Sequence, residues 1–434
     1  MMKINKSKII LLLIVSIVGI FSIFSYNSKK YSNSINIDDS NIKNNNMISM
    51  MLETSAGSGE YQESTASSWP TEGYIFNENI SKCERGSKLT WDDSKKTVIM
   101  SGNEGDKCYV YFDVYKEPTI ITDVCKSNDN LSNCIKNLYV SQGKNNLYLH
   151  DNTLTNGADD GSYRYAGSSD TTNNFVCFGY DSQDGSCPSD NLYRIIGVFE
   201  GEVKLIKYDY AKSTLLGTDG DYYNTYKNWC SSCGTNKGQN SKTEIGVYYW
   251  NYSNGRSSTN DWSLSRLNTI NLNKNYINNI GTKWSEKISD HTWKVGGNTW
   301  SNIGLQTAPT AYQNEINSPA TNKTVNAKVG LMYVSDYGYA VEPSAWGTTL
   351  SNYESIGITN KSWIYMGLRE WTLAPQADIS SYVFYVYEKG DVNNDYVYGN
   401  YENAGYAARP VLYLKSTIGY GGGSGTAAKP ILVK

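Results

Sequence analysis

The sequence predicts an α+β protein, with a small all-β domain ahead of a larger α+β domain and an N-terminal transmembrane or signal helix. Three observations predict this arrangement. Short apolar runs with strand alternation recur along the chain, an uncharged apolar run stands near its start, and eight cysteines occupy its middle. The length of 434 residues is enough for two or three domains of ~150 residues each.

Residues 1–26 are predicted to form a signal-anchor or a cleaved signal peptide. Three lysines precede an uncharged apolar run from Ile9 to Phe24, slightly shorter than the ~20 residues that span a bilayer. The run ends in bulky residues without an Ala-x-Ala cleavage pattern, which favours the anchor. The preceding lysines place the N-terminus in the cytoplasm. We therefore expect a single-pass cell-membrane protein whose C-terminal bulk is extracellular, or a secreted protein if the segment is cleaved.

Residues 27–69 are predicted to be a disordered linker, because SNSINIDDSNIKNNN and ETSAGSGEYQESTASS are polar and lack apolar periodicity. Residues 70–145 are predicted to form the small β domain. In this range KLTWDDSKKTVIMSG has two short strands around a polar turn. The stretch KCYVYFDVY alternates Cys108, Val110 and Phe112 with more polar neighbours, which is the period of a strand.

The cysteines predict disulfides, since an oxidising compartment makes bonds between sequence neighbours the simplest arrangement. The expected neighbours are Cys83 with Cys108, Cys125 with Cys134, Cys177 with Cys187, and Cys230 with Cys233. A bond between Cys83 and Cys108 would close the first hairpin. The last couple, in WCSSC, also fits a thiol–disulfide motif or half of a metal site, but loop sequence on both sides favours a structural disulfide.

Residues 146–434 are predicted to form the larger domain. NLYRIIGVFEGEVKLIKYDYA contains two apolar strands, 192–199 and 203–210, joined by a Glu-Gly turn. WSLSRLNTINLNKNYINNI has the apolar spacing of one or two amphipathic helices. Further strands are expected in KVGLMYVSDYGYA, SSYVFYVYEKG and ARPVLYLK, and GYGGGSGTAAKPILVK is expected to end the chain as a flexible Gly-rich segment.

The order of FVCFGY…CPSDNLYRIIGVFEGEVKLIK, HTWKVGG, KVGLMYVSDYGYA, WIYMGLREWTL and YAARPVLYL resembles bacterial surface domains of the C-type-lectin-like fold. The formylglycine-generating enzymes and the variable ligand-binding proteins of diversity-generating retroelements share that fold. Upstream, CERGSKLTWDD…DKCYVYFD resembles a short repeat of predicted surface proteins from Gram-positive and gut bacteria. The resemblance implies a compact C-terminal domain with short helices and a small central antiparallel sheet.

In the variable members of that group, side chains on and just before the final strands form the ligand face. Carried over to this chain, the resemblance implies a Tyr/Asn-rich ligand-binding face made of Asn393, Asn394, Asp395, Tyr396, Tyr398, Asn400, Tyr401 and Asn403. Tyrosine supplies contact area at low entropic cost and asparagine adapts its hydrogen bonds, as in antibody loops. A plain solvated loop of the same composition is the alternative.

Several kinds of chemistry are not expected. A net charge of −3 without a Lys/Arg cluster argues against a nucleic-acid partner, and only two histidines argue against zinc and histidine-based catalysis. Formylglycine-generating activity is not transferred, because no cysteine follows Cys233. Glu342-Pro343-Ser344 lacks the third residue of a lectin calcium motif, and Tyr396 replaces the glycine of a calcium loop starting at Asp391. We expect no catalytic residue, no metal and no cofactor.

The sequence therefore predicts a membrane-anchored extracellular surface protein that serves in adhesion or recognition. Its partners are expected to be the membrane, through the N-terminal helix, and a protein or glycan ligand at the cell surface, met by the Tyr/Asn-rich face. Two alternatives stay open. One is a structural envelope protein without a specific ligand, and the other is an extracellular hydrolase of wall polymers, which needs two carboxylates ~5–10 Å apart in one cleft.

Overall fold

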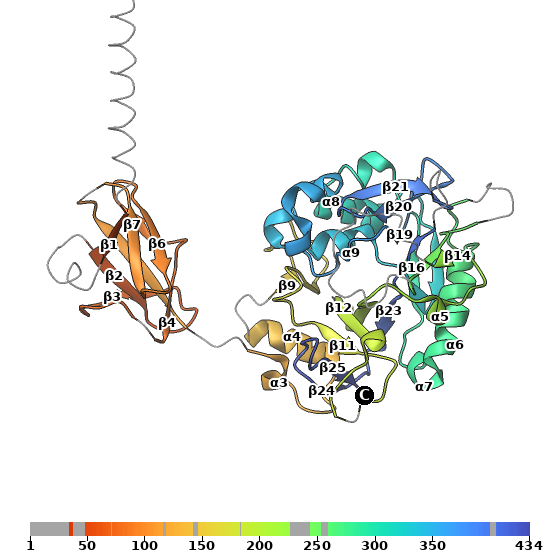
Figure 1. Cartoon of the computed structure of the whole chain (residues 1–434), viewed down its shortest axis with the longest axis horizontal. Coiled ribbons are helices and arrows are strands. Elements are labelled where there is room, and N and C mark those ends of the chain that lie inside the picture. Colours follow the sequence, from red (N-terminus) through yellow and green to blue (C-terminus); the bar gives the residue numbers. More distant parts are fainter. Residues whose placement is uncertain are drawn as a thin grey trace, which may run out of the picture. The chain divides into compact units, whose positions relative to one another are not determined.

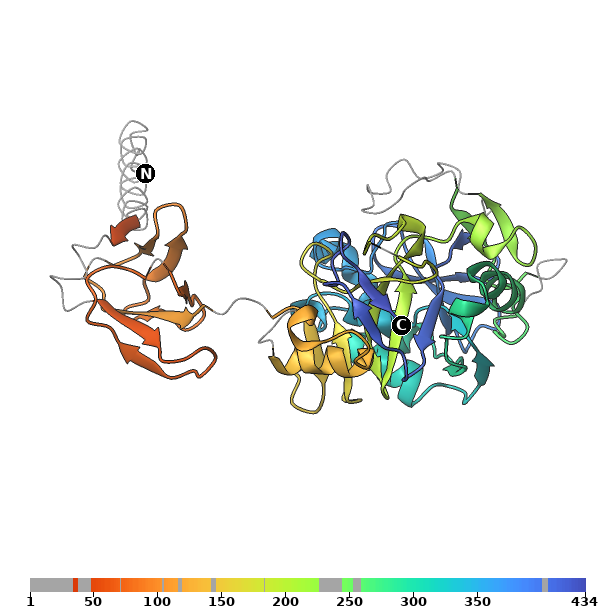
Figure 2. The ribbon, with the colours of Figure 1, turned by 90° about the horizontal axis from the view of Figure 1, so that it is seen from below.

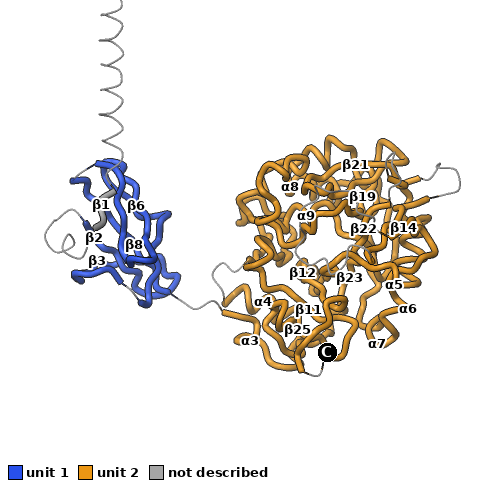
Figure 3. The backbone as a smooth tube through the Cα atoms, viewed as in Figure 1, with its two compact units in different colours: residues 1–117 blue, residues 118–434 orange. Residues whose placement is uncertain are grey.

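The computed structural model of the chain describes residues 34–37, 48–70, 72–103, 105–115, 119–141, 146–182, 184–225, 244–252, 259–399 and 405–434. The chain divides into two compact units, Met1–Glu117 and Pro118–Lys434 (Figure 3). Strand outweighs helix, and each unit has buried apolar residues of its own. The predicted membrane or signal segment, 1–26, lies outside the described residues. Among those that are described, no helix is long and apolar enough to cross a membrane.

Unit 1 consists of two small sheets. One has the order β3-β2-β8-β4, with β5 also paired to β8, and the other has the order β1-β7-β6. The strands are β1 (Ser34–Ile37), β2 (Ile48–Glu53), β3 (Tyr61–Glu63), β4 (Tyr74–Phe76), β5 (Lys82–Cys83), β6 (Lys88–Asp92), β7 (Thr97–Ser101) and β8 (Cys108–Val114). The predicted hairpin is confirmed as β6–β7, and β8 buries Cys108, Val110 and Phe112 as its alternation predicts.

The prediction that residues 27–69 form a disordered linker is wrong for residues 48–69, which contain strands β2 and β3 of unit 1, while residues 27–33 and 38–47 lie outside the described residues. Strand β2 pairs with β8 in parallel, so it lies inside its sheet. Met50 on β2 is 2% exposed, and the Trp69 ring packs against Phe112 at 5.6 Å between centroids. The apolar alternation of ISMMLE carries this strand, but it is only six residues long and stands between two polar stretches whose composition suggests a linker.

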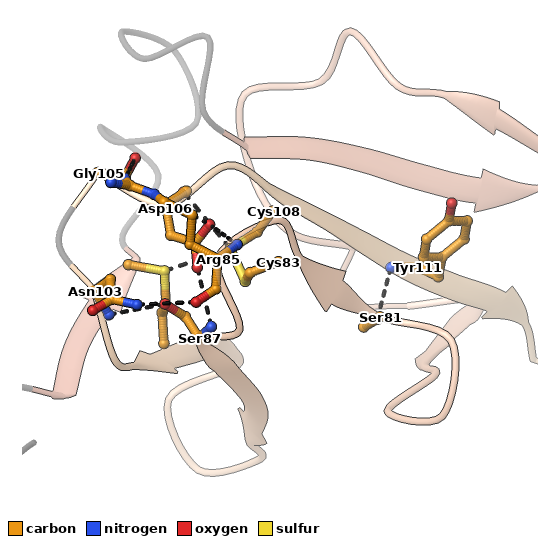
Figure 4. Close-up of a disulfide and its surroundings, with 10 residues drawn as sticks. Ser81, Cys83, Arg85, Ser87, Asn103, Gly105, Asp106, Cys108 and Tyr111 are labelled. Carbon is orange, nitrogen blue, oxygen red and sulfur yellow. Dashed lines mark hydrogen bonds and ion pairs between the residues drawn. A yellow bond between two sulfur atoms is a disulfide. The ribbon is translucent and has the colours of Figure 1, made fainter.

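The first predicted disulfide is present and closes the hairpin that the sequence indicates (Figure 4). Cys83 and Cys108 are directly opposed on β5 and β8. Beside them the carboxylate of Asp106, which is 1% exposed, accepts hydrogen bonds from the backbone N–H groups of Arg85 at 2.7 Å and Ser87 at 3.0 Å. The bond and the carboxylate together fix the turn between β5 and β6.

Met50→Ala tests whether β2 belongs to the core of unit 1. Removing a buried methionine side chain is expected to lower the free energy of unfolding by about 2–5 kcal/mol. The matched control is Met51→Ala, since Met51 is only partly buried on the neighbouring position of the same strand, and it is expected to cost much less. Thermal unfolding of both variants measures the difference. Equal, small losses would contradict a core position for Met50.

Unit 2 is built around two larger sheets. The first has the order β18-β23-β13-β12-β11-β25-β24, with β10 paired to β12 and β9 to β10, and the second has the order β14-β15-β22-β19-β20-β21. The first sheet contains β9 (Leu147–His150), β10 (Ser162–Tyr165), β11 (Phe175–Cys177), β12 (Leu192–Phe199), β13 (Glu202–Lys207), β18 (Val329–Gly330), β23 (Val411–Leu414), β24 (Tyr420–Gly422) and β25 (Ile431–Val433). The second contains β14 (Tyr222–Thr225), β15 (Gly246–Tyr248), β19 (Glu370–Pro375), β20 (Tyr382–Val386), β21 (Val392–Tyr396) and β22 (Tyr406–Ala407). A separate hairpin joins β16 (His291–Lys294) to β17 (Thr324–Ala327).

Short helices surround these sheets, and Figure 1 shows α8 and α9 beside β19–β21. The α-helices are α3 (Ile121–Val124), α4 (Leu131–Ser141), α5 (Ser213–Leu216), α6 (Ile277–Ile280), α7 (Thr282–Ser285), α8 (Ala308–Tyr312) and α9 (Val334–Tyr339). The π-helical segments are η2 (Leu267–Tyr276) and η4 (Gln313–Asn317), and the 3-10 turns are η1 (Ser189–Asn191), η3 (Trp300–Asn302), η5 (Pro343–Ala345), η6 (Leu350–Ile356) and η7 (Ile358–Asn360). The amphipathic helical prediction is confirmed by the continuous helical segment of η2 and α6, in which η2 buries Leu267, Leu272 and Tyr276.

The boundary predicted at residue 145 is wrong, since unit 2 begins at Pro118. Helix α4 buries Leu131 and Ile135 in the core of unit 2, and the N–H of Leu131 donates to the carbonyl of Ile418 at 2.9 Å. The apolar face of this helix is therefore used by the larger domain. The disulfide Cys125–Cys134, present as predicted, ties the helix to the segment before it.

Two other expectations differ from the structure. KVGLMYVSDYGYA is predicted to be a strand, but only Val329–Gly330 forms one. Val334–Tyr339 is helical instead, because the side chain of Asp336 accepts the backbone N–H of Tyr333 and so stabilises the first turn of a helix. The closing segment is not simply a flexible Gly-rich end. Its strand β25 pairs in parallel with β11, and Figure 2 shows the C-terminus among the blue strands of the sheet.

Other predicted strands of unit 2, and one further disulfide, are confirmed within the described residues. The first predicted strand matches β12 at both ends, and the second matches β13 but ends at Lys207. Strands β20 and β23 are buried as expected. The disulfide Cys177–Cys187 is present, whereas Cys230 and Cys233 lie outside the described residues.

Candidate functional site

A cavity of about 710 Å³ in unit 2 is the candidate site, within the ~300–1,000 Å³ range of small-molecule sites. Its wall comes from the segment leading into β10, the β12–β13 hairpin, β16, α8 with η4, the start of α9, and the end of β23. These elements are far apart in sequence, and the first sheet brings them together. Aromatic, acidic and basic side chains share the lining.

A buried ion pair joins β13 to α9 at this cavity. The ammonium group of Lys204 lies 2.6 Å from the carboxylate of Asp336, and the two side chains are 1% and 2% exposed. Rings surround the ammonium, with centroid distances of 4.6 Å to Tyr333, 5.2 Å to Tyr413 and 5.4 Å to Phe199. Burial lowers the pKa of Lys204, although Asp336 acts against the shift by favouring the charged ammonium. The rings also favour the charged form.

A second ion pair lies on the same wall. Arg164 is buried and pairs with Asp160 at 2.5 Å, while its Nε donates to the Ser162 hydroxyl at 2.8 Å. The hydroxyl of Tyr312 donates to the same carboxylate at 2.8 Å. Burial would raise the pKa of Asp160, but Arg164 and the hydrogen bonds hold it at about 2, so Asp160 is ionised at neutral pH. The guanidinium stacks at 4.7 Å on Phe199, the ring that also faces Lys204.

Helix α9 presents Asp336 because a buried glutamate holds its first turn. The carboxylate of Glu315 accepts the N–H groups of Val334 and Ser335, each at 3.0 Å, and the Ser335 hydroxyl at 2.8 Å. These are N–H groups that a helix leaves free at its first turn. Burial raises the pKa of Glu315 to about 7 despite these hydrogen bonds. Glu315 therefore positions the helix that carries the ion pair.

Some polar atoms of the cavity keep unused hydrogen-bonding capacity. Within the described part of the chain, no partner is found for the hydroxyl of Tyr413, for Nη1 of Arg164 or for Oδ1 of Asp336. The hydroxyl of Tyr333 accepts the backbone N–H of Lys294 at 2.9 Å and can still donate its own proton. Donors and acceptors are thus both left for a ligand.

The side chain of His291 lines the cavity. Its ring stacks on Tyr413 with 3.8 Å between centroids. Burial, with Lys204 nearby, lowers the pKa of His291 to about 4, so the imidazole is neutral at pH 7 and its 4.0 Å separation from Glu202 is not an ion pair there. Glu202 instead accepts the hydroxyl of Ser289 at 2.6 Å.

Four residues of the predicted Tyr/Asn-rich face, Asn393–Tyr396, lie on β21, the edge strand of the second sheet, and Tyr398 follows that strand. Asn393 is exposed, while the side chain of Asn394 donates to Gln376. Asp395 is 6% exposed and accepts the hydroxyl of Tyr406, so this carboxylate points into the domain. Asn400, Tyr401 and Asn403 lie outside the described residues.

The structure brings three tyrosines together at this edge. The ring of Tyr396 lies 4.5 Å from Tyr382 and stacks on Tyr398 at 5.0 Å, and all three side chains are partly buried. A hydrogen bond with Tyr396, together with burial, raises the pKa of Tyr382 to about 12. Two tyrosines of the predicted face therefore form an aromatic cluster with Tyr382, and the role of this face in ligand binding stays a prediction.

No sequence pattern indicates the cavity, because its lining residues come from distant parts of the chain. Lys204 stands in EVKLIK, where a charged residue between buried neighbours was a usable signal. Asp336 was assigned to a strand, and no spacing in the sequence connects it to Lys204 or Arg164. The chain has only two histidines, which gave no sequence signal for the cavity, yet one of them, His291, lines it and stacks on Tyr413.

Comparison with protein-family models, with curated protein sequences and with solved structures finds no match for this chain. The resemblance to C-type-lectin-like domains therefore stays a prediction. What can be said of function comes from the geometry of the cavity and of the β21 edge.

The two histidines of the chain, His150 and His291, are expected to stay neutral well below pH 6.5. Burial lowers their pKa values to about 2 and about 4. Both groups titrate near 6.5 when unfolded, so the unfolded chain binds more protons below that pH. Their contribution to stability is present above pH 6.5 and is lost as the pH falls towards the folded values. Histidine NMR signals should not titrate between pH 7 and 5, and a midpoint near 6.5 would contradict this environment.

Proposed function

We propose that this protein is a membrane-anchored extracellular surface protein that captures a small polar ligand in the cavity of a C-type-lectin-like domain. The observation that carries the proposal is the convergence of two buried ion pairs, Lys204–Asp336 and Arg164–Asp160, on one cavity wall. The three disulfides support an oxidising compartment. The apolar run in residues 1–26 supports the anchor.

The free-energy cost of burying the two ion pairs supports a ligand-binding role for the cavity. Removing two charges from water costs several kcal/mol per ion, and packed apolar side chains often serve stability as well or better. Here the charges line an open volume rather than a closed core. Such groups are already desolvated and held in place by neighbouring hydrogen bonds, so a ligand meets a preorganised site.

The same carboxylates support capture rather than hydrolysis. A glycosidase needs one carboxyl group with a raised pKa as its general acid. Asp160 has a pKa of about 2 and is held by Arg164, and Asp336 is committed to Lys204 and to the N–H of Tyr333. Both are therefore better suited to accept hydrogen bonds from a ligand than to donate a proton to one.

The double variant Lys204→Met, Asp336→Asn tests the cavity. It removes both charges, and the asparagine oxygen can still accept the N–H of Tyr333, so the fold is expected to survive. A library of sugars, amino acids, nucleosides and short peptides is screened by thermal shift on the full chain. Compounds that bind the cavity are expected to raise the melting temperature of the unaltered protein by a few degrees near saturation, and that of the variant by much less.

The matched control is Lys361→Met, Glu342→Gln, which removes a partly exposed pair of 3.6 Å separation outside the cavity lining. It is expected to keep every shift seen with the unaltered protein. Shifts that survive in the cavity variant, or no shift with any compound, would contradict the proposal.

The β21 edge is a second candidate contact surface, favoured by the cluster of Tyr382, Tyr396 and Tyr398. Partly buried tyrosines at a sheet edge suit a macromolecular ligand, since each supplies apolar contact area together with a polar hydroxyl. We propose this surface for the protein or glycan ligand of the adhesion hypothesis.

Tyr396→Ala combined with Tyr398→Ala is expected to abolish reproducible signals of the full chain on protein and glycan arrays, because it removes the stacked pair. Tyr180→Ala, at an isolated tyrosine that is 43% exposed, is the control and is expected to leave them unchanged. Unaltered array signals from the double variant, with folding intact, would remove this surface from consideration.

A further inference from the structure

We propose that the outer edge of β4 in unit 1 is a docking site for an extended, basic segment of another protein, which adds to the sheet as a further strand. The site belongs to a different unit from the cavity and from the β21 edge, so it goes beyond the function proposed above. Three features carry it: the unused backbone groups of β4, the exposed apolar side chains around this strand, and the charges at its two ends.

The hydrogen bonds around β4 show which of its backbone groups are unused. The residues on either side of the strand, Gly73 and Asn77, hydrogen-bond to β8 through their backbone groups, at 2.8 and 2.9 Å. Antiparallel pairing alternates along a strand, so Ile75 is the residue between them whose backbone groups point toward β8. The N–H and C=O groups of Tyr74 and Phe76 then point away from β8. No other strand among the described residues pairs with β4 on that side.

The edge of β8 beyond β4 is already covered, so β4 itself provides the open edge. Strand β5 pairs with β8 at the disulfide of Cys83 and Cys108. Between β4 and β5, the hydroxyl of Ser81 accepts the backbone N–H of Tyr111 at 2.9 Å (Figure 4). A segment that approaches the sheet from this side therefore meets β4, and open edges of this kind accept an added strand through backbone hydrogen bonds.

The exposed apolar side chains of unit 1 also mark this edge. Within the described residues of the unit, the large ones are Ile75, Ile80 and Tyr115, with exposed fractions of 54%, 39% and 47%. Ile75 lies at the centre of β4, Ile80 in the turn that follows it, and the N–H of Tyr115 donates to the carbonyl of the residue before the strand. The opposite edge strand, β3, has no exposed apolar side chain. An added strand therefore removes apolar surface from water at β4 rather than at β3.

The charges at the two ends of β4 determine the kind of segment that fits. Glu72 precedes the strand, Glu78 follows it, and both are exposed. Neither has an ion-pair partner in the part of unit 1 that the structure describes. A segment with lysine or arginine at both ends meets complementary charge in either strand direction.

The same two glutamates oppose pairing with a second copy of the chain. A symmetric antiparallel pair of β4 strands centred on Ile75 places Glu72 of one copy opposite Glu78 of the other. Like charges that face each other across two strands are destabilising. The edge is therefore protected against self-association and remains open to a basic partner.

The experiment measures the binding of labelled synthetic peptides to the full chain by fluorescence anisotropy. The probe is a short peptide of alternating valine and threonine with two lysines at each end. One comparison peptide has glutamate in place of every lysine, and another has N-methyl groups on its central backbone nitrogens. The lysine peptide is expected to bind, and the glutamate peptide to bind about tenfold more weakly or not at all. The N-methylated peptide is expected not to bind, because it lacks the backbone donors that an added strand uses.

Charge reversal in the double variant Glu72→Lys, Glu78→Lys tests the assignment to β4. Both residues are exposed, so the melting temperature is expected to stay nearly unchanged. The lysine peptide is expected to bind about tenfold more weakly to this variant, and the glutamate peptide is expected to bind instead. The matched control is Glu60→Lys, Glu63→Lys, which makes the same change of net charge at exposed positions of the β3 edge. It is expected to keep the preference of the unaltered chain for the lysine peptide.

Four results would overturn the proposal. They are the absence of binding by the lysine peptide, equal binding by the N-methylated peptide, loss of binding in the β3 variant instead of the β4 variant, and a dimer of the unaltered chain that Ile75→Lys abolishes in analytical ultracentrifugation. The last result would assign the β4 edge to a second copy of the chain. None of these results bears on the cavity, which is tested separately by Lys204→Met, Asp336→Asn.

Discussion

The ion pair between Lys204 and Asp336 is the interaction on which the arrangement of the cavity depends. Lys204 lies on β13, between strands β12 and β23 of the first sheet, and Asp336 lies in the first turn of α9. Neither charge can be buried alone at reasonable cost, so the sheet and the helix must come together in one register. The pair is therefore a positional constraint as much as a source of stability, and Glu315 reinforces it by fixing the same helical turn.

Aromatic side chains let the cations remain buried. Phe199 lies 4.7 Å from the guanidinium of Arg164 and 5.4 Å from the ammonium of Lys204, so one ring serves both ion pairs. The quadrupole of a ring attracts a cation without supplying a second negative charge. Tyrosine side chains therefore act inside the domain as well as on its surface, because the rings of Tyr333 and Tyr413 surround the ammonium group of Lys204.

Short sequence patterns predicted individual strands and disulfides, but they did not predict contacts between residues far apart in the sequence. Strands β8 and β12 follow from short apolar patterns, and three cysteine couples bond as neighbours. The short strand β2 was not predicted, because the polar residues on both sides of it indicate a linker. Its own apolar alternation covers only six residues. The helix at Val334–Tyr339 was missed because its start is set by Asp336 and by Glu315.

The candidate site was harder to foresee, for a physical reason. Its ion pairs join residues 160 with 164 and 204 with 336, and only the first has a spacing that a sequence pattern can suggest. The second exists because a sheet and a helix meet. Of the predicted Tyr/Asn-rich face, Tyr396 and Tyr398 stack on each other, whereas Asp395 accepts an interior hydrogen bond from Tyr406, and ligand binding by this face stays a prediction.

The position of β25 has a consequence for how the polypeptide reaches its final form. This strand, Ile431–Val433, lies between β11 and β24, and its partner β11 was synthesised long before it. Until β25 leaves the ribosome, the edge of β11 that it covers has no backbone partner, and long-range parallel pairing is slow to form. The first sheet of the larger unit therefore stays incomplete until β25 has been synthesised, and in that interval its unpaired strand edge is open to association with other chains.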